Sequence, residues 1–173
     1  MTAAPLQDLI DRLPPPGGRP ADPADRGRLR QMVMADAQHM LGDIPAAARS
    51  LMVSVQVESR LANLCRGRED SVTLLLGPAD QPMGMMLLDP ASPGGLSLLE
   101  LMVLPDHRNK GYGNAALAAL CAHADAGQSP IQCRLFFDNP IRRLLTRHGF
   151  TMAADHGIDI VMRRPAMALA AAL

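Results

Sequence analysis

The chain has few aromatic residues: of its 173 residues, three are phenylalanine, one is tyrosine and none is tryptophan. So few rings cannot fill a core, which must therefore be packed mainly by leucine, valine, alanine and the twelve methionines. Methionine is flexible and fits irregular gaps. The cluster of Met83, Met85 and Met86 therefore indicates core before it indicates a ligand site.

Cysteine is scarce as well. Cys65, Cys121 and Cys133 are an odd number, lie far apart and form no Cys-x-x-Cys pair. This pattern argues against a disulfide framework and against a zinc site. We therefore expect no metal site and a reducing, cytoplasmic environment.

Neither a charge excess nor a long apolar run is present. Lysine plus arginine (17) balances aspartate plus glutamate (17), so no overall field attracts the chain to nucleic acid or to an anionic membrane. Residues 1–13 include Asp8 and Asp11, unlike a signal peptide, and no segment approaches the roughly 20 apolar residues of a membrane span. We expect neither nucleic acid nor a membrane as a partner.

Apolar residues at helical spacing predict helices at 5–13, 23–41 and 45–65. The predicted apolar faces are Leu6, Leu9, Ile10 and Leu13 in the first helix; Leu29, Met32, Val33, Ala37, Met40 and Leu41 in the second; Met52, Val55, Ala62 and Cys65 in the third. The alternation of Val53, Val55 and Val57 would also suit a strand, and we favour the helix. The Pro/Gly-rich residues 14–20 predict a linker without regular structure.

From Ser71 onward, short apolar runs between turns predict three meandering antiparallel strands at 72–76, 83–88 and 96–103. A helix at 113–126 follows, with Leu117, Leu120, Cys121 and Ala124 on its buried face and Gly127 as a left-handed cap. A strand at 131–137, a helix at 140–147 and a strand pair at 150–154 and 158–163 complete the order.

The turn between the strand at 96–103 and the helix at 113–126 has the composition of an anion site. It reads Arg108-Asn109-Lys110-Gly111-Tyr112-Gly113. Two glycines let the backbone curl with its N–H groups pointing inward, and the helix adds unpaired N–H groups and the positive end of its dipole. A pyrophosphate is the natural occupant of such a turn.

The pattern Arg-x-x-Gly-x-Gly between a strand and a helix resembles the acyl-coenzyme A signature of the GNAT N-acetyltransferase superfamily. About thirty residues later, the segment 138–150 is similar to the second signature of that family, a short helix closed by Gly149-Phe150. The resemblance covers roughly residues 71–165. It implies an α+β fold: a mixed central sheet of about six to seven strands flanked by helices, with a V-shaped cleft between strands 4 and 5.

The resemblance also implies where acetyl-CoA would bind. The backbone N–H groups of the turn would hold the pyrophosphate, and the edge of the fourth strand would pair with the pantetheine arm. The cofactor-binding candidates are Leu101, Met102, Val103, Arg108, Asn109, Lys110, Gly111, Tyr112, Gly113, Asn114 and Asn139. Glu100 is the candidate catalytic base, and the alternative is a carboxylate that orients the substrate or pairs with a neighbouring arginine.

The chain departs from the family pattern at two positions. Leu145 stands where many relatives have the tyrosine that protonates the leaving thiolate. The family asparagine of the second signature aligns onto Asp138, with Asn139 one residue away. Both departures bear on catalysis more than on cofactor binding.

A dinucleotide-binding loop is the competing interpretation, because Gly111-x-Gly113-x-x-Ala116 also satisfies that fingerprint. Residues 105–110 are too many between the strand and the first glycine, however, and the chain after Phe137 cannot supply further parallel βαβ units. The acyl-CoA interpretation is therefore preferred.

We divide the chain into an N-terminal extension with its linker (1–23), a GNAT-like domain (24–165) and an apolar tail (166–173). The expected activity is transfer of an acetyl group from acetyl-CoA to a small-molecule or peptide primary amine, by direct attack in a ternary complex. A catalytically weak or inactive acyl-CoA-binding sensor is the second candidate, motivated by Leu145. A toxin-like enzyme acting on charged transfer RNA is disfavoured by the neutral charge. A homodimer stays open.

Overall fold

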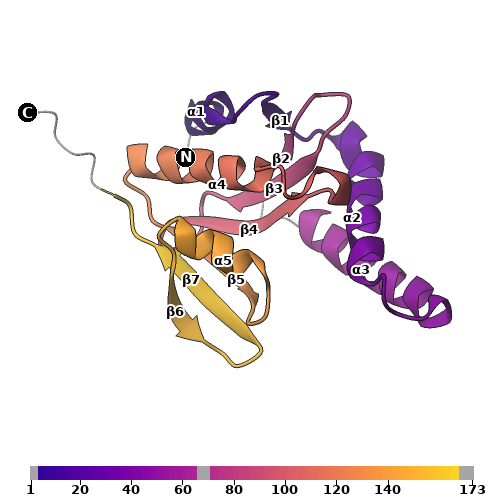
Figure 1. The fold of residues 1–173 in the computed structure, drawn as a ribbon. Coiled ribbons are helices and arrows are strands. Elements are labelled where there is room, and N and C mark those ends of the chain that lie inside the picture. Colours follow the sequence, from indigo (N-terminus) through magenta and orange to yellow (C-terminus); the bar gives the residue numbers. More distant parts are fainter. Residues whose placement is uncertain (1–3, 66–70, 168–173) are drawn as a thin grey trace, which may run out of the picture.

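A computed structural model describes residues 4–65 and 71–167 of the protein (Figure 1). The helices are α1 (Ala4–Arg12), α2 (Arg26–Met40), α3 (Ala46–Cys65), α4 (Tyr112–Ala126) and α5 (Ile141–Arg147), with short 3-10 turns η1 (Pro23–Asp25) and η2 (Pro105–His107). The strands are β1 (Gly18–Pro20), β2 (Val72–Leu76), β3 (Gly84–Asp89), β4 (Leu96–Val103), β5 (Ile131–Phe136), β6 (Thr151–Asp155) and β7 (Asp159–Arg164). No described helix has both the length and the apolar composition to cross a membrane.

The seven described strands form one mixed sheet in the order β1-β2-β3-β4-β5-β7-β6. All neighbours are antiparallel except β4 and β5, which are parallel and pair only at Leu96↔Ile131 and Ser97↔Gln132. Beyond these two pairs the strands separate. The mixed sheet and its V-shaped opening between β4 and β5 are therefore as the sequence predicted.

Strand β4 contains a bulge where it leaves β5. Leu87 of β3 pairs with Glu100, while the next residue, Leu88, pairs with Leu98, so that Leu99 is an extra residue in β4. Side chains of a strand alternate between the two faces, and one extra residue reverses the alternation. If Leu99 took a regular place in the ladder, Glu100 would share a face with Leu98. The bulge instead turns Glu100 to the opposite face.

Two apolar clusters fill the two faces of the sheet. The larger lies under α1, α4 and α5 and includes Leu96, Leu98, Leu117, Leu120, Leu145 and Phe150. The smaller lies under α2 and α3 and includes Met32, Val33, Val53, Val57, Met85 and Met102. Figure 1 shows α2 and α3 together at one side of the sheet, while α4 runs along β4. Met85 and Met86 are fully buried, one in each cluster, so they belong to the core as expected.

The N-terminal segment differs from the expectation at residues 14–20. Instead of an irregular linker, it contains the three-residue strand β1, in which Gly18 pairs with Leu76. Glycine is needed there, because a Cβ at Gly18 would lie 2.6 Å from the carbonyl oxygen of Leu75. Arg19 fixes the strand through two hydrogen bonds, of 2.6 and 2.7 Å, to the Asp25 carboxylate. The sheet therefore begins with a short strand at its β2 edge.

The sequence predicted the positions of the helices better than it predicted which of their faces are buried. Residues 46–65 are a helix, as we favoured, but its buried residues are Val53 and Val57, whereas Met52 and Val55 of the predicted face are exposed. A spacing of four places two valines on one helix face and turns the middle one outward. In α2, Met40 is likewise exposed rather than buried.

The predicted faces of α1 and α4 are confirmed, since Leu9 and Leu13 are buried and so are all four residues predicted for α4. The left-handed cap after α4 was assigned to the wrong residue. Gly127 has φ −84° and Gln128 has φ 49°. The chain therefore turns one residue later than the glycine suggested.

Candidate active site

The turn between β4 and α4 is curled as predicted, although only one of the two glycines contributes a left-handed residue. Asn109 (φ 59°) and Gly111 (φ 86°) are both left-handed, and Gly111 is the residue from which α4 begins. A Cβ at Gly111 would meet no atom within 4 Å, so the space beside this residue is open. The first turn of α4 leaves its N–H groups without partners inside the helix.

The side chains of the turn are mostly engaged in holding it. Arg108 donates from Nε to the carbonyl oxygen of Val103 (2.9 Å), and Lys110 donates from Nζ to the carbonyl oxygen of Asp106 (2.7 Å). The Asn114 amide oxygen lies 3.0 Å from Nε2 of His148. An anion in the turn would therefore meet backbone N–H groups rather than free cations.

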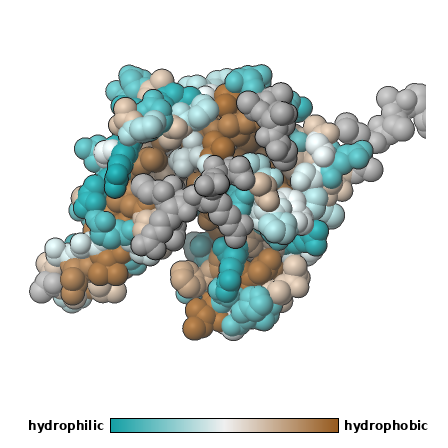
Figure 2. All heavy atoms as spheres, turned by 180° about the vertical axis from the view of Figure 1, so that it is seen from behind, coloured by the Kyte–Doolittle hydropathy of each residue, from teal (hydrophilic) through white to brown (hydrophobic). Residues whose placement is uncertain are grey.

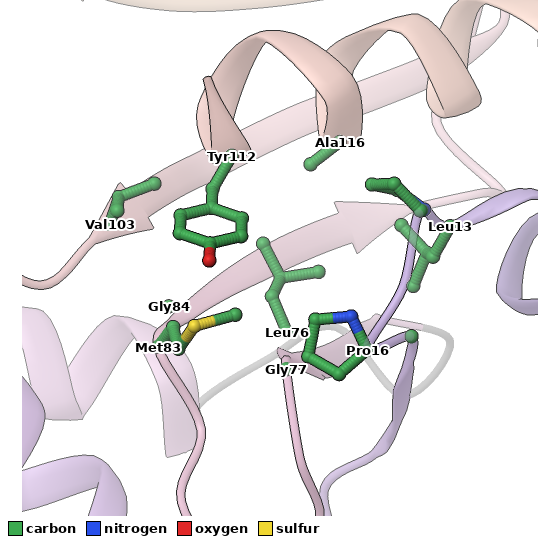
Figure 3. Close-up of a pocket in the computed structure, with 11 residues that line it drawn as sticks. Leu13, Pro16, Leu76, Gly77, Met83, Gly84, Val103, Tyr112 and Ala116 are labelled. Atoms are coloured by element: carbon green, nitrogen blue, oxygen red, sulfur yellow. The ribbon is translucent and has the colours of Figure 1, made fainter. Parts of the chain in front are cut away.

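Tyr112 points away from the concave side of the turn. Figure 3 shows its ring directed into a pocket between α4 and the ends of β2 and β3, with the hydroxyl toward Met83 and Leu76. Its N–H group belongs to the start of α4, whereas its side chain closes this separate apolar pocket. The tyrosine hydroxyl thus lies among apolar residues beside the start of α4.

Three further cofactor candidates lie on β4. Residues 98–103 have β3 on one side, while pairing with β5 stops at Ser97. The backbone edge of Leu101 and Val103 toward β5 is therefore available for pairing with an extended arm, as a neighbouring strand would use it. The Met102 side chain is buried in the α2/α3 cluster, and its backbone groups point toward Met85 of β3, so Met102 offers little to a ligand. Asn139 is engaged elsewhere, because its Oδ1 accepts a hydrogen bond from the Ile141 N–H (3.0 Å).

Glu100 does not stand alone on the α3 side of the sheet. Its Oε1 accepts a hydrogen bond from the guanidinium of Arg60 on α3, and the same nitrogen of Arg60 lies 3.4 Å from the Met102 sulfur. The two side chains are 24% (Arg60) and 19% (Glu100) exposed, so solvent still reaches the pair. This is the arginine-paired arrangement that we considered as the alternative to a free base.

The pair extends into a chain of four charges through Asp36 of α2. One oxygen of Asp36 binds Arg60, and the other binds Arg108, the first residue of the Arg-x-x-Gly-x-Gly pattern. Burial disfavours a charged Arg60, but Glu100 and Asp36 outweigh it and raise the pKa of Arg60 above its ordinary value. Two positive and two negative groups thus connect the cofactor side of the cleft to Glu100.

Sequence reasoning missed Arg60 and Asp36. A signal was present, because Asp36 is three residues after Val33 and Arg60 is three residues after Val57, which places both charges on buried helix faces. A charge on an apolar face needs a partner. The partner of each charge could not be identified from the sequence, because Arg60 and Glu100 are 40 residues apart and Arg108 and Asp36 are 72 residues apart.

We expect Asp36→Ala to destabilise the protein by about 3 kcal/mol, at the lower end of the cost of breaking a buried ion pair, because both arginines still reach solvent. Glu58→Ala is the matched control, since Arg30 and Glu58 also join α2 to α3 but are 48% and 60% exposed. Such surface pairs contribute about 0–1 kcal/mol. Urea unfolding followed by circular dichroism compares the two variants. Equal losses would contradict a structural role for the four-charge chain.

Other titratable and buried residues near the site are held in the structure. The ring of His123 on α4 is 12% exposed, and its Nδ1 lies 2.8 Å from the Asp8 carboxylate of α1. Cys133 is buried, which raises its pKa to about 12, so it is no thiolate nucleophile. Leu145 is 1% exposed within the core. The described residues contain no cluster of ligands fit for a metal ion.

Comparison with known proteins assigns the chain to a family. The model of the acetyltransferase (GNAT) family matches residues 47–150, more than half of the chain. The protein belongs to this family. No curated protein sequence matches it. The curled turn after β4 and the separation of β4 from β5 are therefore seen in a member of the GNAT family.

Solved structures share the fold at low sequence identity. The PaiA N-acetyltransferase of Thermoplasma acidophilum, solved in complex with coenzyme A, is 17% identical, with a TM-score of 0.65 over 86% of this chain and 97% of that one. An acetyltransferase of Thermus thermophilus is 21% identical (TM-score 0.63, 86% and 95%). The ribosomal-protein-S18-alanine N-acetyltransferase of Escherichia coli is 14% identical (TM-score 0.60, 90% and 97%). At these sequence identities, the similarity to the solved structures shows a shared fold and nothing more.

Proposed function

We propose that this GNAT protein transfers the acetyl group of acetyl-CoA to a primary amine by direct attack in a ternary complex. The observation that carries the proposal is the position of the curled turn 108–113, which follows the end of β4 that no longer pairs with β5. The pyrophosphate would bind the N–H groups of 109–114, and the pantetheine amides would pair with the edge of 101–103. The coenzyme A in the PaiA structure is consistent with such a ligand.

The chemistry requires a neutral amine and a stabilised leaving group. Glu100 follows the bulge at Leu99, at the point where the cleft widens, and would accept one proton from the acceptor ammonium. The amine nitrogen then attacks the thioester carbonyl carbon, and the C–S bond breaks as the amide forms. The nitrogen loses a second proton, and the thiolate becomes a thiol by taking a proton from solvent, because Leu145 supplies none.

Two measurements test the proposal. Acetyl-CoA at about one hundred times its Kd should stabilise the native state by roughly 2.7 kcal/mol, visible as a raised melting temperature. Release of the coenzyme A thiol is then followed with a thiol reagent across amino acids, diamines, polyamines and peptide N-termini. The buried thiols of Cys121 and Cys133 have raised pKa values and should add little background.

The same measurements separate the second candidate, an acyl-CoA-binding sensor. Two observations favour it: Leu145 in place of an acid, and the pairing of Glu100 with Arg60. A thermal shift without thiol release for any amine supports the sensor. A protein without a thermal shift contradicts both functions.

A further inference from the structure

The Arg60–Glu100 pair poses a problem for any amine that approaches Glu100. In the free protein Glu100 Oε1 is held by Arg60, so an incoming ammonium must replace a guanidinium that is already there. The four-charge chain of Arg108, Asp36, Arg60 and Glu100 has no net charge. It therefore offers no excess negative field to attract a compound that carries several positive charges.

Arg60 would keep its place when Glu100 releases it. One guanidinium nitrogen binds Asp36, whose side chain is 5% exposed, and the other binds Glu100. Asp36 is in turn bound by Arg108. Release of Glu100 therefore leaves this second nitrogen of an anchored arginine with only the Met102 sulfur, a weak acceptor, at 3.4 Å. That nitrogen then needs a new acceptor, because an unpaired charged donor in a half-buried site is unfavourable.

Building on the proposed acetyl transfer, we infer that the acceptor is a small zwitterion in which a carboxylate lies one carbon from the amine, as in a free α-amino acid. Its ammonium binds Glu100, and its carboxylate takes the position on Arg60 that Glu100 leaves. One internal ion pair is exchanged for two pairs with the substrate, and no charge is left alone. The planar guanidinium is well matched to a carboxylate.

The proton balance follows from this exchange. The acceptor enters as an ammonium carboxylate, and Glu100 removes one proton, which passes to solvent. The neutral amine attacks the thioester carbonyl carbon, and the second proton leaves the nitrogen as the amide forms. The products are the N-acetylamino acid, the coenzyme A thiol and one released proton. The product carries no ammonium, so Glu100 returns to Arg60.

The test uses sets of three acceptors that share a side chain. Methionine, methioninamide and 3-(methylthio)propylamine keep the amine and remove the carboxylate in two ways, and the same sets are made for leucine and phenylalanine. Spermidine represents polycations. The amide has the less basic amine and is neutral more often at pH 8, so intrinsic reactivity favours the amide and opposes our expectation.

We expect the amino acid to exceed its amide and its amine by about 10- to 100-fold in kcat/KM, the cost of leaving a charged donor unpaired. Arg60→Met should remove this preference, and Arg60→Lys should retain part of it. Arg30→Met is the control, since Arg30 also joins α2 and α3 but contacts Glu58 instead of Glu100. A thermal shift with acetyl-CoA verifies that each variant is folded.

The inference is overturned if the wild-type protein acetylates amides, plain amines or spermidine with the same kcat/KM as amino acids. The proposed acetyl transfer would still stand in that case. The inference is also overturned if Arg60→Met, or Arg60→Lys should the first variant not fold, keeps the full preference for the carboxylate. Thermal stabilisation by acetyl-CoA without thiol release from any acceptor removes acetyl transfer itself, and the inference with it.

Discussion

Gly113→Asp is expected to weaken acetyl-CoA binding by roughly 10³-fold while leaving the fold intact. A Cβ at this position would lie 3.5 Å from Cγ2 of Val103 and 3.9 Å from Cδ2 of Leu144, which is ordinary contact. Space therefore permits the side chain, and its charge is the problem. Two like unit charges about 4 Å apart repel by about 4 kcal/mol at an effective dielectric constant of about 20, close to three powers of ten in Kd.

Gly113→Ala is the matched control, because it adds the same Cβ without charge. Isothermal calorimetry with acetyl-CoA gives the two affinities, and circular dichroism verifies that both variants are folded. We expect the alanine variant to bind nearly as well as wild type. If the aspartate variant binds with unchanged affinity, the turn 108–113 does not hold the pyrophosphate.

Glu100→Gln is expected to reduce acetyl transfer by about 10²–10⁴-fold, the usual contribution of a general base. Glutamine keeps the shape of the side chain and still accepts a hydrogen bond from Arg60, but it cannot take a proton from the acceptor. Acetyl-CoA binding should be unaffected, since Glu100 points to the α3 side of the sheet. The thermal shift and the rate of thiol release measure the two effects separately.

Glu58→Gln provides the control for this variant, because Glu58 is paired with an arginine on the outer surface of the same two helices. It should leave transfer at the wild-type rate. If Glu100→Gln also transfers at that rate, the protein is an acetyltransferase whose base is another group. The carboxylate would then serve only to hold Arg60.

The sequence predicted best those features that depend on local pattern. The strands 72–76 and 96–103 and the helix at 113–126 were each placed to within one residue, because apolar spacing and glycine have their effects over a few neighbours. The turn 108–113 was found for the same reason, but only one of its two glycines curls the backbone: the left-handed residues are Asn109 and Gly111, and Gly113 lies inside α4.

Features that depend on tertiary contacts were missed or misplaced. The strand β1 has no apolar pattern of its own and exists because Gly18 allows close approach to β2 and Arg19 reaches Asp25. The face of α3 could not be chosen from three alternating valines without knowing what it packs against. Arg60, the residue that changes the interpretation of Glu100, meets it only through the crossing of α3 over β4.

The bulge at Leu99 decides which face of the sheet Glu100 occupies. Leu99 is 47% exposed, so many side chains would fit there, and its place outside the ladder sets the faces of the residues after it. A strand of the same length in which Leu99 took a regular place would carry the carboxylate to the α4 side and present an apolar side chain to Arg60. Deletion of Leu99 would instead make Leu98 and Glu100 neighbours, in register with Leu88 and Leu87, and leave the carboxylate on the α3 side. Equivalent residues in GNAT relatives must be matched by counting outward from the bulge in both directions, and not along the strand as if it were uninterrupted.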